Sequence, residues 1–116
     1  MRRGMALTNR ISGAQAEEYG VLNPLLVAMY GEFQELSKKK PQDVVSKGKV
    51  RLVNRILSPV IELLKDEPSR AFLDLLDEDE LPENSDVVLM LGQAIAAMKS
   101  FRSRYTLHGD WLIARD

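Results

Sequence analysis

Residues 84–105 read NSDVVLMLGQAIAAMKSFRSRY, and their spacing decides the fold class of the chain. The main apolar residues return at steps of four and three: Val87, Leu91, Ala94, Met98, Phe101 and Tyr105. These steps stay on one side of an α-helix, so the segment predicts a helix with a single apolar face. Asn84, Ser85 and Asp86 favour helix N-termini, and we expect the helix to begin there. Gly92 within it lowers helix propensity and leaves room for a neighbouring helix.

Two earlier segments have the same spacing. From Ser46 onward the apolar residues keep their phase across Pro59, which predicts one kinked helix rather than two: Val50, Val53, Leu57, Val60 and Leu64. The Asn23-Pro24 pair is a typical helix start, and Pro41 is expected to end that helix after Leu22, Leu26, Met29, Phe33 and Leu36. Gly13 and Gly20 disfavour a long helix further upstream.

These three segments predict an all-α fold, an up-down bundle of three to four helices joined by short loops. Residues 70–76, capped by Ser69, are expected to form a short apolar helix at one end of the bundle. We expect one domain over residues 1–116, with residues 1–12 flexible and residues 106–116 forming a C-terminal tail.

Within the tail, the Gly109-Asp110 pair lies between two short runs that contain aromatic residues. Such a pair predicts a two-residue turn and hence a small β-hairpin, which would need the bundle or a second chain to hold it. The alternative interpretation makes Asp110 the cap of one last helical turn.

The composition excludes several classes of function. The 116 residues include no cysteine, so disulfides, thiolate metal sites and cysteine nucleophiles are excluded, and a reducing, cytoplasmic location is favoured. One histidine without cysteine does not make a typical zinc site, and the sequence has no glycine-rich phosphate-binding motif. We therefore expect no metal and no cofactor. Apolar runs stay far short of the ~20 residues that cross a bilayer, so no membrane segment is expected.

The charges are strongly segregated along the chain. Residues 1–56 carry ten basic and five acidic side chains, residues 57–98 carry two and ten, and residues 99–116 carry four and two. A chain with this layout can pair its own halves or associate with a copy of itself. The acidic run is densest at Asp77, Glu78, Asp79 and Glu80, which we interpret as a docking surface for a basic partner or for the basic segment of the chain.

The basic segment 38–55 is a candidate for binding nucleic acid. Lys47, Arg51 and Arg55 are spaced four residues apart and therefore share one side of the predicted helix, where they could meet phosphates. No aromatic residue lies between them, so the segment offers no platform for base stacking. The competing interpretation is a solvated helix face.

Arg102 and His108 form a candidate catalytic pair. An Arg followed by a His after five residues resembles the Arg-x(4–6)-His motif of HEPN-family ribonucleases, which are all-α proteins. The resemblance implies a dimer in which the doubled pair cleaves RNA without a metal, the His moving a proton and the Arg holding a phosphate. The competing interpretation is an exposed histidine in a turn.

Apolar residues outnumber those needed for three narrow helix faces. Leu25, Leu52 and Ile56 lie off those faces, as do Val88 and Leu89. A surplus of this kind predicts an exposed apolar patch that a partner covers. The function we favour from the sequence is therefore a non-catalytic protein–protein interaction module or regulatory subunit, with Val88, Leu89 and the acidic run as candidate contact residues. We expect a homodimer or a larger complex; the ribonuclease and the nucleic-acid-binding regulator are the alternatives.

Overall fold

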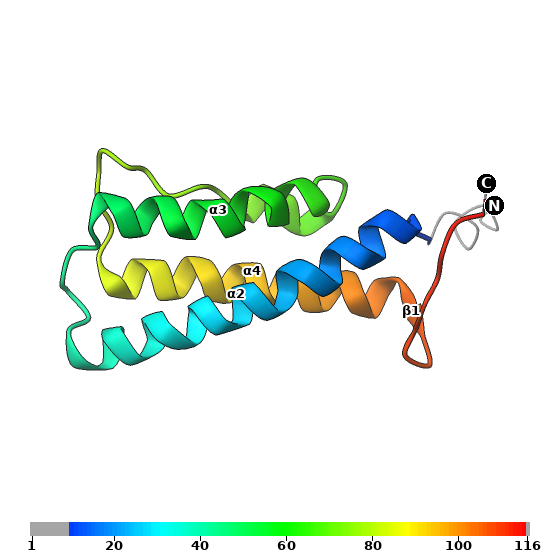
Figure 1. Cartoon of the computed structure of the whole chain (residues 1–116), viewed down its shortest axis with the longest axis horizontal. Helices are drawn as coiled ribbons and strands as arrows, with labels where there is room; N and C mark the ends of the chain where they lie inside the picture. Colours follow the sequence, from blue (N-terminus) through cyan, green and yellow to red (C-terminus); the bar gives the residue numbers. More distant parts are fainter. Residues whose placement is uncertain (1–9, 116) are drawn as a thin grey trace.

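The computed structural model describes residues 10–115 as three long helices and a short C-terminal hairpin (Figure 1). The helices are α2 (Gly13–Lys39), α3 (Lys47–Leu63) and α4 (Asn84–Arg104). They lie side by side along the length of the molecule, so the predicted all-α bundle is confirmed. In Figure 1, α3 and α4 run in the same direction and α2 runs opposite to both.

Helix α2 begins ten residues before the predicted start at Asn23-Pro24, so that prediction is wrong. The side chain of Ser12 accepts a hydrogen bond from the Gln15 amide, and the Gln15 side chain accepts one from the Ser12 amide. This capping box, together with the burial of Tyr19, stabilises the extra turns. Pro24 is tolerated inside the helix because it lies on the exposed side, where water can reach the carbonyl that loses its donor.

Helix α3 follows its prediction closely. Ser46 caps it by accepting a hydrogen bond from the Lys49 amide, and the helix continues through Pro59 as one element. Its buried side chains are five of the apolar residues spaced along it: Val50, Val53, Leu57, Val60 and Leu63. The short turn before α3 is also as expected, because only residues 40–46 separate it from α2.

The connection between α3 and α4 is long, which corrects the expectation of short loops. It holds the 3₁₀ helix η1 (Pro68–Phe72) and then residues 73–83, which extend back along the bundle (Figure 1). The short helix predicted over residues 70–76 has the wrong bounds, because η1 begins at Pro68 and ends at Phe72. Leu73 after it is buried, whereas Phe72 and Leu75 are exposed. Because the chain returns along α3 before entering α4, these two helices run in the same direction, so the alternation expected of an up-down bundle holds only for α2 and α3.

Helix α4 starts at the predicted place but with a different cap. Glu83 is the N-cap, and its amide donates a hydrogen bond to Asp86 Oδ2. Asn84, predicted as a cap residue, is buried instead and donates from its side chain to the Lys40 carbonyl at 2.9 Å. The Asn84 side chain therefore fastens the start of α4 to the end of α2.

One apolar core runs through the bundle. The face predicted for α4 is buried from Val87 to Phe101 and partly buried at Tyr105, and α2, α3 and Leu73 supply the rest of the core. At the hairpin end the core becomes aromatic, with ring centroids of Phe101 lying 5.0 Å from Tyr105 and 6.1 Å from both Tyr19 and Trp111. Such ring pairs add to the stabilisation that burial provides.

The predicted hairpin is present, shifted by one residue. Its strands are β1 (Thr106–Leu107) and β2 (Asp110–Trp111), and the turn is His108-Gly109 rather than Gly109-Asp110. Both turn residues have positive φ, as a tight two-residue hairpin requires. This register turns Trp111 toward Tyr19 and Phe101, whereas a slip of one residue would turn it away. The alternative of a last helical turn capped by Asp110 is wrong.

The tail also secures the start of α2. Of residues 1–12, predicted to be flexible, the first nine lie outside the described residues. Ile11 is buried, donates its amide hydrogen to Leu112 and accepts a hydrogen bond from Ala114. The flexibility predicted for residues 1–12 is therefore wrong at Ile11, because the tail covers it.

Alanine substitutions at Gly92 and Gly109 should change the stability of the fold in opposite directions. A Cβ on Gly92 would lie 3.5 Å from Tyr30, an ordinary contact, so the close helix approach predicted there does not require glycine. We expect Gly92→Ala to raise the free energy of unfolding by about 0.5–1 kcal/mol through helix propensity. Gly109 has a φ of +86°, which strains a residue with a side chain, so Gly109→Ala should lower the free energy of unfolding by about 1 kcal/mol or more. Thermal and urea unfolding of both variants measures the two changes, and a loss of stability in Gly92→Ala would contradict the first.

Candidate interaction surfaces

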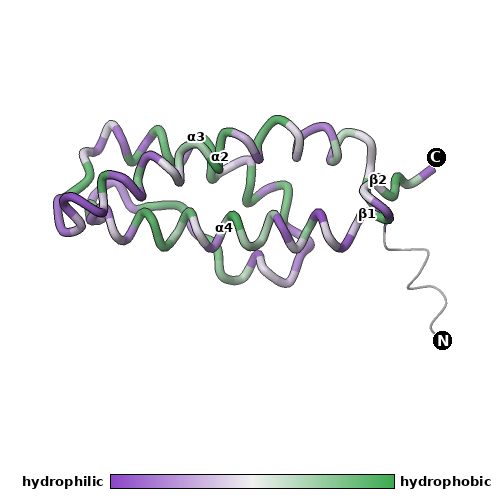
Figure 2. Tube along the Cα trace, turned by 90° about the horizontal axis from the view of Figure 1, so that it is seen from below, coloured by the Kyte–Doolittle hydropathy of each residue, from purple (hydrophilic) through white to green (hydrophobic). Residues whose placement is uncertain are grey.

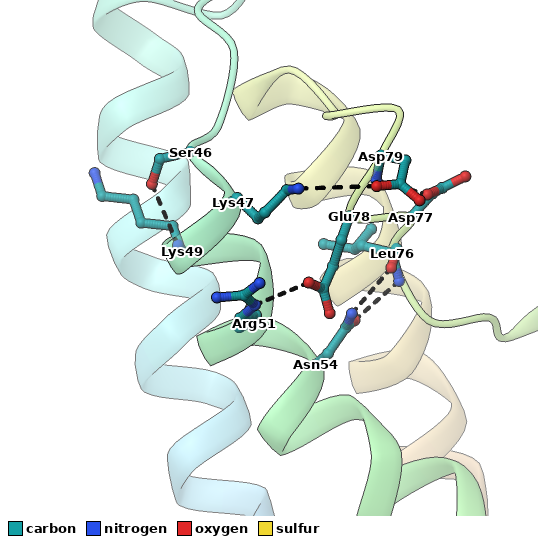
Figure 3. Close-up of polar contacts among 9 residues, drawn as sticks. All are labelled: Ser46, Lys47, Lys49, Arg51, Asn54, Leu76, Asp77, Glu78 and Asp79. Atoms are coloured by element: carbon teal, nitrogen blue, oxygen red, sulfur yellow. Dashed lines mark hydrogen bonds and ion pairs between the residues drawn. The ribbon is translucent and has the colours of Figure 1, made fainter.

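Residues 73–83, which we call the acidic strap, lie along the basic side of α3 (Figure 3). Arg51 Nε donates to Glu78 Oε1 at 2.8 Å, and Lys47 Nζ lies 3.8 Å from Asp79 Oδ1. The basic and acidic segments seen in the sequence therefore pair with each other within the same chain. All four side chains remain substantially exposed, so each pair contributes little stability by itself.

Asn54 anchors the strap more firmly than the ion pairs do. Its side chain donates to the Leu76 carbonyl and accepts from the Leu76 amide, both at 2.9 Å (Figure 3). One side chain therefore satisfies both backbone groups of a residue in an extended segment, in a partly buried position. Sequence reasoning missed this contact. The sequence holds one signal of this contact: Asn54 is a polar residue three positions after Arg51, on the same side of the helix as Lys47.

The four acidic residues predicted as a docking surface have different roles. Asp77 Oδ1 accepts from the amides of Asp79 and Glu80 at 2.8 Å and 3.4 Å, which closes a turn within the strap. Glu78 and Asp79 face α3, as described above, and Glu80 is exposed. Much of this acidic run is therefore engaged inside the chain.

The same contacts bear on the nucleic-acid hypothesis. Two of its three cations, Lys47 and Arg51, face carboxylates of the strap, while Arg55 is exposed one turn further along α3. Nearby carboxylates oppose the approach of a phosphate to these two cations. Nucleic-acid binding through residues 38–55 stays a prediction.

Other cations gather where α2 ends and α3 begins. Lys39, Lys40 and Lys49 line a hollow of about 470 Å³ together with Ser46 and Asn84. Figure 2 shows hydrophilic residues concentrated at this end of the molecule. Lys49 extends toward α2 in Figure 3, away from the strap. At this end, Lys39, Lys40 and Lys49 of the basic segment are open to solvent.

A second hollow, the α2–α3 groove, is mainly apolar. It measures about 150 Å³ and is lined by Met29, Glu32, Phe33 and Leu36 of α2 and by Lys49, Leu52 and Val53 of α3. Phe33 and Val53 are buried and form its floor. Leu52 is 51% exposed on its wall, and Leu25, one helical turn before Met29, is exposed as well. Leu52 therefore lines the groove, and Leu25 extends its α2 side by one helical turn.

The predicted contact residues Val88 and Leu89 lie elsewhere, on α4. Val88 is half-buried against the core, whereas Leu89 is 67% exposed. The next residues along that side of α4 line a shallow hollow with the exposed ring of Phe72: Gln93, Ala96 and Ser100. The structure thus separates Leu89 from the α2–α3 groove.

Arg102 and His108 have separate surroundings within one chain. The Arg102 guanidinium lies over the Trp111 ring, 5.3 Å from its centroid. His108 is exposed at the tip of the hairpin with a φ of 55°. The ribonuclease hypothesis requires two copies of this pair in one cleft, and a single chain does not test it, so it stays a prediction.

Near the hairpin, Glu67 is an almost buried carboxylate, with its side chain 8% exposed. It accepts a hydrogen bond from the Tyr105 hydroxyl at 2.7 Å and lies 3.5 Å from Arg104 Nη1. Burial, followed by the hydrogen bond to Glu67, raises the pKa of Tyr105 to about 12. The contact joins the connection after α3 to the end of α4, and sequence reasoning missed it because 38 residues separate the partners.

The Tyr105–Glu67 hydrogen bond predicts a dependence of stability on alkaline pH. The folded chain holds the Tyr105 proton more tightly than the unfolded chain does, so this contribution is complete below pH 10 and is lost between pH 10 and about 12. Tyr105→Phe should lower the free energy of unfolding at pH 7 by about 1.5 kcal/mol. The difference between wild type and variant in denaturant titrations should shrink above pH 10. A difference that stays constant up to pH 12 would contradict the assignment.

Asn54 and Arg51 allow a matched test of what holds the strap. Asn54→Ala leaves two backbone groups of Leu76 without their partner and should cost about 2–3 kcal/mol of stability. Arg51→Ala removes only an exposed ion pair and should cost less than about 1 kcal/mol. Urea unfolding of both variants measures these costs, and equal costs would mean that charge rather than the Asn54 amide holds the strap.

Between residues 10 and 115, no three or more His, Asp or Glu side chains are grouped so that they could hold a metal ion. No helix in the same range has the length and apolar character needed to cross a membrane. No protein family model, characterised protein or solved structure matches this chain. Function is therefore inferred from the geometry and chemistry of the chain itself.

Proposed function

We propose that this chain is a non-catalytic interaction module that binds a protein partner along the α2–α3 groove. The observation that supports the proposal is an open apolar hollow whose floor is core and whose walls are exposed leucines. Exposed apolar surface on a folded chain is unfavourable in water, and a partner that covers it gains the free energy of burial.

The groove fits a partner better than the exposed side of α4 does. Its walls rise from two helices, so an inserted side chain meets apolar atoms on both sides and the buried ring of Phe33 below. On α4, by contrast, the exposed Leu89 is followed by the smaller or polar side chains of Gln93 and Ala96. Binding energy concentrates where an apolar side chain enters a well-formed pocket, which favours the groove.

The proposal includes the cytoplasmic location and the role as a regulatory subunit expected from the sequence. A module of this kind needs no bound cofactor, because its partner is recognised by shape and by apolar contact. Glu32 and Lys49 line the groove together with the apolar residues, and such charged residues can select the orientation of a partner.

Crosslinking from the groove tests the proposal. A photoreactive residue at position 52 should form crosslinks to a protein chain in cells, and one at position 107, a leucine with similar exposure on the hairpin, should not. The crosslinks from position 52 should disappear with Leu25→Glu, which places a charge in the same surface, and should persist with Leu89→Glu on α4. Thermal melting of each variant shows that the fold is kept. Equal crosslinking from positions 52 and 107, or no response to Leu25→Glu, would contradict the proposed function.

A further inference from the structure

Building on the proposed function, we infer that the partner in the α2–α3 groove is a second copy of this chain. The two copies are related by a two-fold axis that runs parallel to the helices. The inference is carried by the charges on either side of the groove, which are opposite in sign and therefore complementary to those of a copy turned over onto it.

The two helices that flank the groove carry opposite charges along most of their length, although α2 ends with Lys38 and Lys39 and Glu62 lies in the last turn of α3. Residues 13–37 of α2 carry four acidic side chains and no basic one: Glu17, Glu18, Glu32 and Glu35. Residues 47–61 of α3 carry four basic side chains and no acidic one. Two of these four, Lys47 and Arg51, face the acidic strap, which leaves Lys49 and Arg55 on the rest of the helix surface. The groove therefore has an acidic side on α2 and a basic side on α3.

Simple geometry decides how a copy can cover such a surface. A two-fold axis parallel to the helices places α2 of one copy over α3 of the other, so acidic sides meet basic sides twice. An axis perpendicular to the helices, within the same plane, would place α2 over α2 and like charges together. Because α2 and α3 run in opposite directions, the favoured arrangement also makes each facing pair of helices antiparallel, as in four-helix bundles.

The level of each residue along the axis stays unchanged by this rotation. Glu32 and Lys49 line the same hollow and therefore lie at nearly the same level. In the assembled pair, Glu32 faces Lys49 of the partner subunit, and the reverse contact forms as well. The leucines at positions 25, 36 and 52 come to lie at the centre of the contact, where apolar burial contributes most of the affinity.

The mass of the chain in solution gives the first test. Sedimentation over a wide range of concentrations should show a dimer of the wild-type chain. Leu52→Glu should weaken the dimer about tenfold or more in Kd, because the charge is buried at its centre. Leu89→Glu, the same substitution on an exposed leucine of α4, should leave the mass unchanged. Leu25→Glu provides a second variant in the groove, and circular dichroism verifies that each variant folds.

Charge reversal tests the arrangement of the two copies. Glu32→Lys and Lys49→Glu should each weaken self-association, whereas an equal mixture of the two variants should form a heterodimer in native mass spectra, because both contacts are then attractive. Glu32→Gln should weaken the wild-type dimer roughly two- to fivefold. A dimer that tightens with Glu32→Gln would overturn the parallel axis, since it would mean that Glu32 faces its own copy.

The outcomes separate this inference from the proposed function. A chain that remains a monomer at all concentrations, yet crosslinks from position 52 to a different protein, overturns the inference and keeps the interaction module. A dimer that responds to Leu89→Glu and not to Leu52→Glu overturns both, because the contact would then lie on α4. A dimer that responds only to the groove variants supports both.

Discussion

Burial of the apolar face of α4 is the constraint on which the rest of the structure depends. Val87, Leu91, Ala94 and Met98 are fully buried, and Phe101 is almost so. One neighbouring helix cannot cover a face of this length and width, so α2 and α3 share it, and η1 and the strap close the remaining side. The aromatic cluster around Phe101 then holds the hairpin, and the hairpin covers Ile11 at the start of α2.

This arrangement gives α3 three different sides. One side enters the core with Val53 and Leu57, and a second meets the acidic strap through Arg51 and Asn54. The third side, with Lys49 and Leu52, borders α2 and stays open as the wall of the groove. The strap neutralises Lys47 and Arg51 on one side of α3, whereas Lys49 lies on the side beside the groove. The charge asymmetry of the groove thus follows from the path of the chain between α3 and α4.

Some elements could be predicted because local signals agreed with the final packing. Ser46 caps α3, the helix continues across Pro59, and the 84–105 segment buries the face that its spacing indicates. The start of α2 was missed because the strong local signal at Asn23-Pro24 was overridden by the buried Tyr19 and by the Ser12 capping box. The surplus leucines were recognised, but their grouping into one groove was not, because it requires knowing which helices are neighbours.

The sequence by itself determined that three long segments are helical and which of their sides are apolar, because a helix returns the same side every three to four residues. Capping signals marked the start of α3 but misplaced the start of α2, where tertiary contacts extend the helix. Only the tertiary structure decided the direction of α4, the role of the acidic strap and the place of Arg102 on Trp111. These features arise from contacts between residues far apart in the chain, such as Asn54 with Leu76 and Tyr105 with Glu67. The periodicity of a segment indicates which side of its helix is buried, whereas the packing of the whole chain determines which other segments cover that side.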